Sequence, residues 1–129
     1  MDETPKALLA MHEPTWASTL GRMLTRRGYE LLTADTVDEM KEHMIVSDDG
    51  IPQNHISLYL MDANLGSPGS SSYEPAEEIF ELLRPDYESG KVKYLSITGN
   101  SDDAEELNQG GIPCTGKNNT AEISDFINR

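Results

Sequence analysis

Three side chains that could handle a phosphoryl group stand just after apolar runs of the sequence. Asp62, Thr98 and Lys117 follow the third, fourth and fifth of these runs. A carboxylate such as Asp62 can attack phosphorus and form an acyl phosphate. A hydroxyl donor and an ammonium group can stabilise the negative charge that a phosphoryl group carries during transfer. Each residue alone is common in loops, so the indication of phosphoryl chemistry comes from their placement together.

Five apolar runs alternate with segments whose apolar residues recur at helical spacing. This alternation is typical of βαβ units that build a parallel sheet. Ligands of such sheets bind beyond the carboxyl ends of the strands, so the three side chains should share one edge. We therefore predict an α/β fold, a single-domain (βα)5 doubly wound parallel sheet that occupies residues 1–129. The strands are expected at 7–11, 29–34, 56–61, 92–97 and 112–115.

Turn and capping residues mark the expected helix boundaries. Gly28 suits the left-handed end of the first helix. Thr36 begins a T-x-x-E capping box that should open the second helix. Pro75 fits the first turn of the third helix and Pro85 should stop it. Thr120 is expected to cap the last helix.

The composition excludes several classes of partner and location. There are 10 Lys and Arg against 23 Asp and Glu, a formal net charge of −13, which disfavours binding to nucleic acid and to anionic lipid. A single cysteine, Cys114, rules out an intramolecular disulfide. No stretch approaches the roughly 18 apolar residues of a membrane span, and the N-terminus has no signal-peptide pattern. A cytoplasmic protein is expected.

Several segments, taken in order, resemble the response regulator receiver domains of the CheY-like superfamily. They are GYELLTA followed by TVDEM within 28–40, LMDANL at 60–65, SITG at 96–99 and GIPCTGK at 111–117. The resemblance covers nearly the whole chain, and it lies in the order and spacing of the segments together. It implies the flavodoxin-like strand order 2-1-3-4-5.

The resemblance also implies a function and its partners. Asp62 would accept phosphate from the phosphohistidine of a histidine kinase or phosphotransfer protein, assisted by Mg²⁺. Thr98 and Lys117 would then shift toward the phosphoryl oxygens and bias a protein-binding face that a downstream partner reads. Such a domain is not an enzyme, beyond its own phosphorylation and dephosphorylation.

The sequence departs from the family at the metal site. Receiver domains usually carry two adjacent acids after the first strand, where this chain has Met11 and His12. Mg²⁺ requires oxygen ligands, and neither a thioether nor an imidazole supplies one. Glu13, Asp62 and Asn64 remain as oxygen donors, which predicts a weak or absent Mg²⁺ site.

The loss of the acid pair also changes the charge balance at the phosphoacceptor. With two carboxylates removed, the repulsion that Mg²⁺ normally offsets is relieved. Lys117 could then neutralise Asp62 directly, which favours a site that is metal-free at rest.

Two departures concern the output of the domain. Cys114 occupies the place of the family's aromatic switch residue, and Asn118 replaces the proline that usually follows the lysine. The Gly- and Ser-rich stretch 66–73 is expected to be a flexible connector.

The sequence leaves two alternative functions open. A pseudo-receiver would keep the fold as an interaction module that needs no phosphorylation. A haloacid-dehalogenase-like phosphatase would also use Asp62, Thr98 and Lys117. It would, however, want an acid at position 64 and a cap domain for which the chain has no room, so it is disfavoured.

Overall fold

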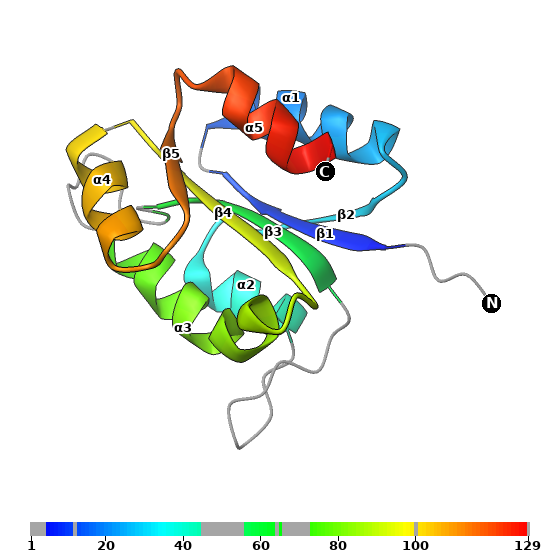
Figure 1. Cartoon of the computed structure of the whole chain (residues 1–129). Coiled ribbons are helices and arrows are strands. Elements are labelled where there is room, and N and C mark those ends of the chain that lie inside the picture. The colour runs from blue at the N-terminus through cyan, green and yellow to red at the C-terminus, as the bar shows by residue number, and fades with distance from the viewer. Residues whose placement is uncertain are drawn as a thin grey trace.

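Strands and helices alternate along the chain, as the spacing of the apolar runs predicts (Figure 1). The computed structural model describes residues 5–11, 13–44, 56–63, 65, 73–99 and 101–128. The strands are β1 (Lys6–Ala10), β2 (Glu30–Thr33), β3 (Ile56–Asp62), β4 (Lys93–Thr98) and β5 (Cys114–Gly116). The helices are α1 (Pro14–Arg26), α2 (Val37–Met44), α3 (Glu74–Glu88), α4 (Ser101–Gln109) and α5 (Thr120–Asn128). Most of the loop predicted at 66–73 lies outside the described residues.

The five strands form one parallel sheet in the order β2-β1-β3-β4-β5. The order 2-1-3-4-5 and the single-domain α/β fold are thus confirmed. The register pairs Asp62 with Ile97 and Thr98 with Gly116. Because all the strands run in one direction, their carboxyl ends meet at one edge of the sheet.

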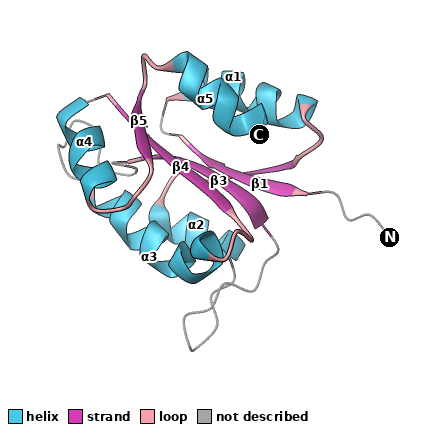
Figure 2. Ribbon diagram, viewed as in Figure 1, coloured by secondary structure: helices cyan, strands magenta, loops and turns pink. Residues whose placement is uncertain are grey.

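Helices cover both faces of the sheet, with α1 and α5 on one side and α2, α3 and α4 on the other (Figure 2). Alternate residues of a strand point to opposite faces. Leu8 and Ala10 therefore pack under α2 and α3, while Ala7 and Leu9 pack under α1 and α5. This two-sided burial explains why β1 and β3 are almost wholly apolar in sequence.

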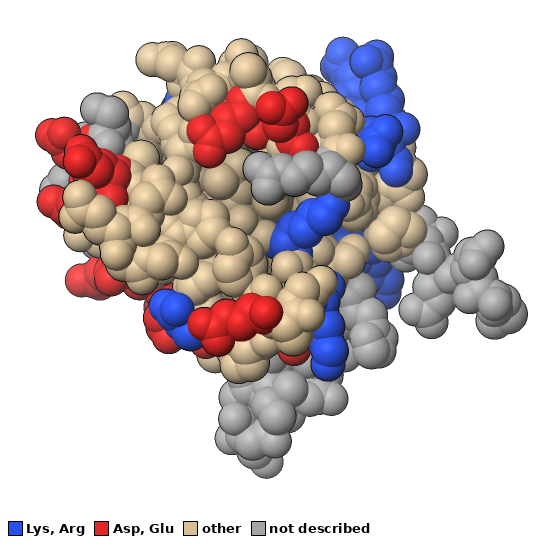
Figure 3. All heavy atoms as spheres, in the orientation of Figure 1, with Lys and Arg blue, Asp and Glu red and all other residues tan. Residues whose placement is uncertain are grey.

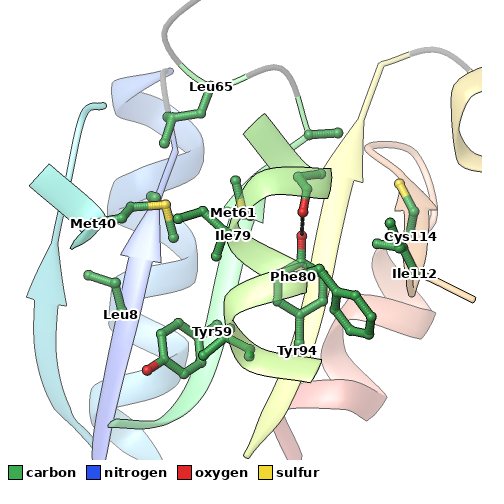
Figure 4. Packing of buried hydrophobic residues seen from close by; sticks show 14 of the residues in the cluster. Leu8, Met40, Tyr59, Met61, Leu65, Ile79, Phe80, Tyr94, Ile112 and Cys114 are labelled. Carbon is green, nitrogen blue, oxygen red and sulfur yellow. Dashed lines mark hydrogen bonds between the residues drawn. The ribbon is translucent and has the colours of Figure 1, made fainter. Parts of the chain in front are cut away.

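An aromatic group forms the centre of the core beneath α3 (Figure 4). The Phe80 ring lies 5.1 Å from each of the Tyr87 and Tyr94 rings, measured between centroids, in an edge-on and a tilted arrangement. The Tyr94 hydroxyl donates a 3.2 Å hydrogen bond to the Ala76 carbonyl. Burial raises the pKa of Tyr94 and of Tyr59 above the ordinary value of a phenol, so both remain neutral at physiological pH.

The prediction that Pro85 stops the third helix is wrong, because α3 continues through it to Glu88. Proline removes one helical hydrogen bond and crowds the preceding turn. Packing of the last turn opposes this cost: Tyr87 lies edge-on to Phe80, and the Arg84 guanidinium sits 4.8 Å above the same ring. The Arg84 guanidinium also forms a 2.7 Å ion pair with Glu81. These side-chain contacts within α3, together with the packing of Phe80 and Tyr87 in the core, therefore oppose the local signal.

Replacing Pro85 by alanine is expected to stabilise the protein by about 1–3 kcal/mol. The side chain at this position is exposed, so alanine leaves no cavity and restores a backbone donor to α3. Urea denaturation followed by circular dichroism would measure the change, with the exposed Gln109→Ala as a control for helix propensity alone. A Pro85→Ala protein no more stable than the control would show that α3 tolerates the proline without cost.

The helix starts follow the capping signals, with one correction. The Thr36 hydroxyl accepts a 3.1 Å hydrogen bond from the Glu39 amide, which confirms Thr36 as the cap of α2. At α5, however, Thr120 is already the first helical residue, so its prediction as the cap is wrong. The Asn119 side-chain oxygen accepts a 3.4 Å hydrogen bond from the Glu122 amide and provides the cap.

The outer edge of β5 is closed by a side chain of α4. Asn108 accepts from the Cys114 amide at 3.1 Å and donates to the Cys114 carbonyl at 2.8 Å, as a neighbouring strand would. The strand itself begins at Cys114, two residues later than the predicted start at Ile112. Closing the edge in this way fixes the strand that leads into Lys117 and satisfies backbone groups that would otherwise face solvent.

Charged side chains are unevenly distributed over the surface. Figure 3 shows acidic side chains over α4 and α5 and basic ones at the far end of α1. The acidic residues of the two helices are Asp102, Asp103, Glu105, Glu106, Glu122 and Asp125. This face carries the same sign of charge as a phosphate backbone, so it repels nucleic acid. No helix in the described part of the chain is long and apolar enough to cross a membrane.

Candidate functional site

The structure brings Asp62, Thr98 and Lys117 together at the carboxyl edge of the sheet. Asp62 is the last residue of β3 and pairs with Ile97, the residue before Thr98 on β4. Both side chains are almost completely buried, with 2% of each residue exposed. The Lys117 amide donates a 2.9 Å hydrogen bond to the Thr98 carbonyl and so extends the β4–β5 pairing into the next loop. The placement predicted from the sequence is therefore confirmed by the fold.

The Lys117 ammonium lies between two carboxylates. Its nitrogen is 2.7 Å from Glu13 Oε1 and 3.8 Å from Asp62 Oδ1. The first distance is that of a charge-assisted hydrogen bond, while the second is an ion pair beyond hydrogen-bonding range. The lysine side chain is 23% exposed and that of Glu13 is 51% exposed. The bridge joins the start of α1 to the loop between β5 and α5.

The backbone around Glu13 directs its side chain toward this bridge. Glu13 is the N-cap residue of α1, but its carboxylate makes no capping hydrogen bond. Its φ of −84° and ψ of 123° are extended, as the following Pro14 requires. Pro14 itself suits the first helical position. The carboxylate of an otherwise poor capping residue is thereby available to Lys117.

A hollow opens beside the site at the carboxyl ends of β4 and β5. Its volume is about 650 Å³, and it is lined by Thr98, Gly99 and residues 116–119. Lys117 and Thr98 both contribute to its wall, and Lys117 also approaches Asp62. An anionic group in this hollow would meet the Lys117 ammonium and the Thr98 hydroxyl, two groups that can stabilise the charge of a phosphoryl group.

The described residues offer few oxygen ligands to a Mg²⁺ ion. They contain no group of three or more His, Cys, Asp or Glu side chains that could hold a metal ion. His12 and Asn64 lie outside the described residues. Met11 is 3% exposed and packs in the apolar cluster beneath α1 and α5. Of the proposed oxygen donors, Asp62 and Glu13 remain, and the Glu13 carboxylate is engaged by an ammonium, whereas Mg²⁺ demands a near-octahedral oxygen shell.

Cys114 packs in the core and not in the site. It is 3% exposed in the cluster that includes Tyr94. Burial raises the pKa of its thiol above the ordinary range, although a hydrogen bond with Ser96 opposes this effect. A buried neutral thiol is unreactive. Cys114 therefore packs as a small apolar residue, at a position where receiver domains commonly have an aromatic residue.

Two polar contacts near the site carry no signal in the sequence. The Thr115 hydroxyl donates a 2.9 Å hydrogen bond to Glu122, which links β5 to α5. The Tyr73 hydroxyl donates a 2.7 Å hydrogen bond to Glu106, which links the start of α3 to α4. This bond raises the pKa of Tyr73 to about 12. Side-chain pairs separated by many residues obey no local pattern, so no periodicity reveals them.

Comparisons with solved structures agree with the observed fold, whereas the sequence comparisons find no match. No protein-family model matches the sequence, and no curated protein matches it significantly. Among the solved structures that match is the response regulator TrrA of Thermotoga maritima in complex with Mg²⁺-BeF. It has 21% identity, a TM-score of 0.66, and coverage of 96% of each chain. The chain has the fold of response regulator receiver domains.

Two further receiver-type structures support the same fold. A response regulator receiver domain protein from Clostridium thermocellum has 23% identity and a TM-score of 0.66, with 96% of this chain and 91% of that one covered. A response regulator from Burkholderia pseudomallei, solved with a phosphorylated aspartic acid and a calcium ion, has 23% identity and a TM-score of 0.60. The match covers 92% of this chain and 64% of that one.

Proposed function

We propose that this receiver-type domain works in a two-component phosphorelay. Asp62 accepts a phosphoryl group from the phosphohistidine of a histidine kinase or phosphotransfer protein. The phosphorylated domain then presents an altered protein-binding face to a downstream partner. The observation that carries the proposal is the grouping at one sheet edge of a strand-end carboxylate, a hydroxyl on the next strand and an ammonium 3.8 Å from the carboxylate.

Each group has a role in the transfer. An oxygen of Asp62 attacks phosphorus, and the bond from phosphorus to the imidazole nitrogen breaks with its electron pair going to the ring. The Lys117 ammonium and the Thr98 hydroxyl stabilise the charge on the phosphoryl oxygens. Because Thr98 lies on β4 and Lys117 follows β5, their movement toward the phosphoryl group would be transmitted to the last strands and helices.

The fold of solved receiver domains supports the proposal by analogy. The Burkholderia pseudomallei response regulator carries phosphate on an aspartic acid, and TrrA was solved with Mg²⁺-BeF. In this chain the strand-end carboxylate of β3 is Asp62, the residue that the same chemistry would modify.

A second candidate is an interaction module that needs no phosphorylation. Two observations favour it: Asp62 is only 2% exposed, and Lys117 is hydrogen-bonded to Glu13. These features would suit a site that no longer undergoes phosphorylation and dephosphorylation. The two candidates make opposite predictions for a phosphodonor.

Incubation with acetyl phosphate is expected to add the mass of one phosphoryl group to the intact protein. The adduct should be absent from Asp62→Asn, because an amide is a far weaker nucleophile than a carboxylate. Asp102→Asn, an exposed substitution on α4 with the same change of charge, is the matched control and should retain the adduct. Intact-mass spectrometry would measure all three proteins.

The proposal fails if no adduct forms with acetyl phosphate or with a histidine kinase, whether or not Mg²⁺ is present. That result would leave the interaction module as the function. An adduct that survives Asp62→Asn would mean that another residue is the phosphoacceptor.

A further inference from the structure

Glu13, the N-cap residue of α1, contacts the side chain of Lys117 in the site. We propose that Glu13 is a positioning residue: it holds the Lys117 ammonium beside Asp62 as the resident cation of the site, so that Asp62 accepts a phosphoryl group without a divalent metal ion. This inference rests on the function proposed above and specifies how its site works.

The distances show which carboxylate holds the lysine. The Lys117 nitrogen is hydrogen-bonded to Glu13 at 2.7 Å and stands 3.8 Å from Asp62. Without Glu13, the ammonium would be expected to close onto the buried Asp62 carboxylate, where electrostatic attraction is stronger than in water. Glu13 therefore prevents the Lys117 ammonium from closing onto the attacking oxygen of Asp62. The ammonium stays close enough to bind the oxygens of an incoming phosphoryl group.

Local backbone features position both partners of the ion pair. Pro14 fixes the first turn of α1 and holds Glu13 in an extended conformation. Lys117 is fixed in turn by the backbone hydrogen bond of its amide to Thr98. The ion pair between these two positions holds the ammonium beside Asp62 before the phosphoryl group arrives.

The charge balance explains why a metal ion is dispensable. The site lacks the acid pair of a typical receiver domain, so less negative charge surrounds the Asp62 carboxylate and the Lys117 ammonium. In the transfer from acetyl phosphate, an Asp62 oxygen forms its bond to phosphorus. The bond from phosphorus to the acetate oxygen breaks, and acetate leaves with the electron pair. Lys117 and Thr98 stabilise the three phosphoryl oxygens throughout, so every donor in the step comes from the protein.

The first test compares the rate of phosphorylation by acetyl phosphate in EDTA and in Mg²⁺, measured by intact mass. We expect the two rates to agree within about twofold, since the charge-stabilising groups are all side chains. A rate more than tenfold higher in Mg²⁺ would overturn the inference while leaving Asp62 as the phosphoacceptor.

The second test addresses Glu13 itself. In EDTA, Glu13→Gln is expected to slow phosphorylation roughly threefold to tenfold, the range of coupling between contacting charges. Glu13→Asp, which keeps the charge, should restore part of the rate. Glu42→Gln, an exposed substitution on α2 with the same charge change, should have no effect.

A double-substitution cycle separates positioning from a merely structural role. If Glu13 acts through Lys117, Glu13→Gln should change the rate by less than about twofold once Lys117 is methionine. If Glu13 instead supports the start of α1, its removal should slow both backgrounds equally, and the inference fails. Equal rates for wild type and Glu13→Gln would also overturn it. Absence of any adduct from the wild type in EDTA and in Mg²⁺ would overturn the inference and the proposed function together.

Discussion

Replacing Phe80 by alanine is expected to lower the free energy of unfolding by about 3–5 kcal/mol. Phe80 is 1% exposed and lies at the centre of the core beneath α3. Its ring contacts the Tyr87 and Tyr94 rings and forms a cation–π contact with the Arg84 guanidinium. Alanine would leave a cavity and remove two aromatic pairs and a cation–π contact. Since small domains are stable by only about 5–15 kcal/mol, this one change would remove a large part of the total.

Urea denaturation monitored by circular dichroism would measure the loss. Phe80→Leu is the matched control, because it keeps most of the buried volume and should cost less than about half as much as alanine. The contacts of Phe80 with Tyr87 and Arg84 also explain how α3 passes through Pro85. A cost below about 1 kcal/mol for Phe80→Ala would mean that the core collapses into the cavity. Contacts other than those of Phe80 would then have to stabilise α3 around Pro85.

The sheet could be predicted from the sequence because strands that are buried on both faces are apolar along almost their whole length. The apolar runs that become β1 and β3 have too few polar residues for any exposed element, and their alternation with helical segments leaves few topologies. The prediction at Pro85 was wrong because the local effect of the proline is opposed by Tyr87, which packs on Phe80, two turns earlier on the same face of α3. The start of β5 was also misplaced, since pairing with Ser96 begins only at Cys114. Local signals thus give the elements, and tertiary contacts set their ends.

The site was predictable to the extent that the sheet positions it. Asp62, Thr98 and Lys117 each end or follow a strand, so the fold itself brings them together. The contact between Glu13 and Lys117 was not predictable. The sequence suggests it as a metal ligand, whereas the structure places its carboxylate on Lys117, 104 residues away. Which of two carboxylates a lysine approaches depends on distances of about one ångström, and no spacing in the sequence encodes them.

Replacing Lys117 by methionine is expected to tighten Mg²⁺ binding at least about tenfold relative to the wild type. Methionine keeps most of the length of the side chain and removes its charge. The ammonium that lies 2.7 Å from Glu13 and 3.8 Å from Asp62 repels a divalent cation and engages one of the two carboxylates that could bind it. Without it, both carboxylates become available to an ion that commonly binds through one or two carboxylates and several waters. Isothermal titration calorimetry would measure the affinity.

The same variant distinguishes two accounts of the weak metal site. If Met11 and His12 alone weaken it, Lys117→Met should bind Mg²⁺ no better than the wild type. If Lys117 occupies the place of the cation, the affinity should rise in Lys117→Met and fall again when Glu13→Gln is added, because the second change removes a ligand. Phosphorylation in EDTA should meanwhile slow in Lys117→Met and recover on addition of Mg²⁺, since a divalent ion can then stabilise the phosphoryl oxygens in place of the ammonium. A variant that stays slow in Mg²⁺ would show that the ammonium and the metal ion are not interchangeable at this carboxylate.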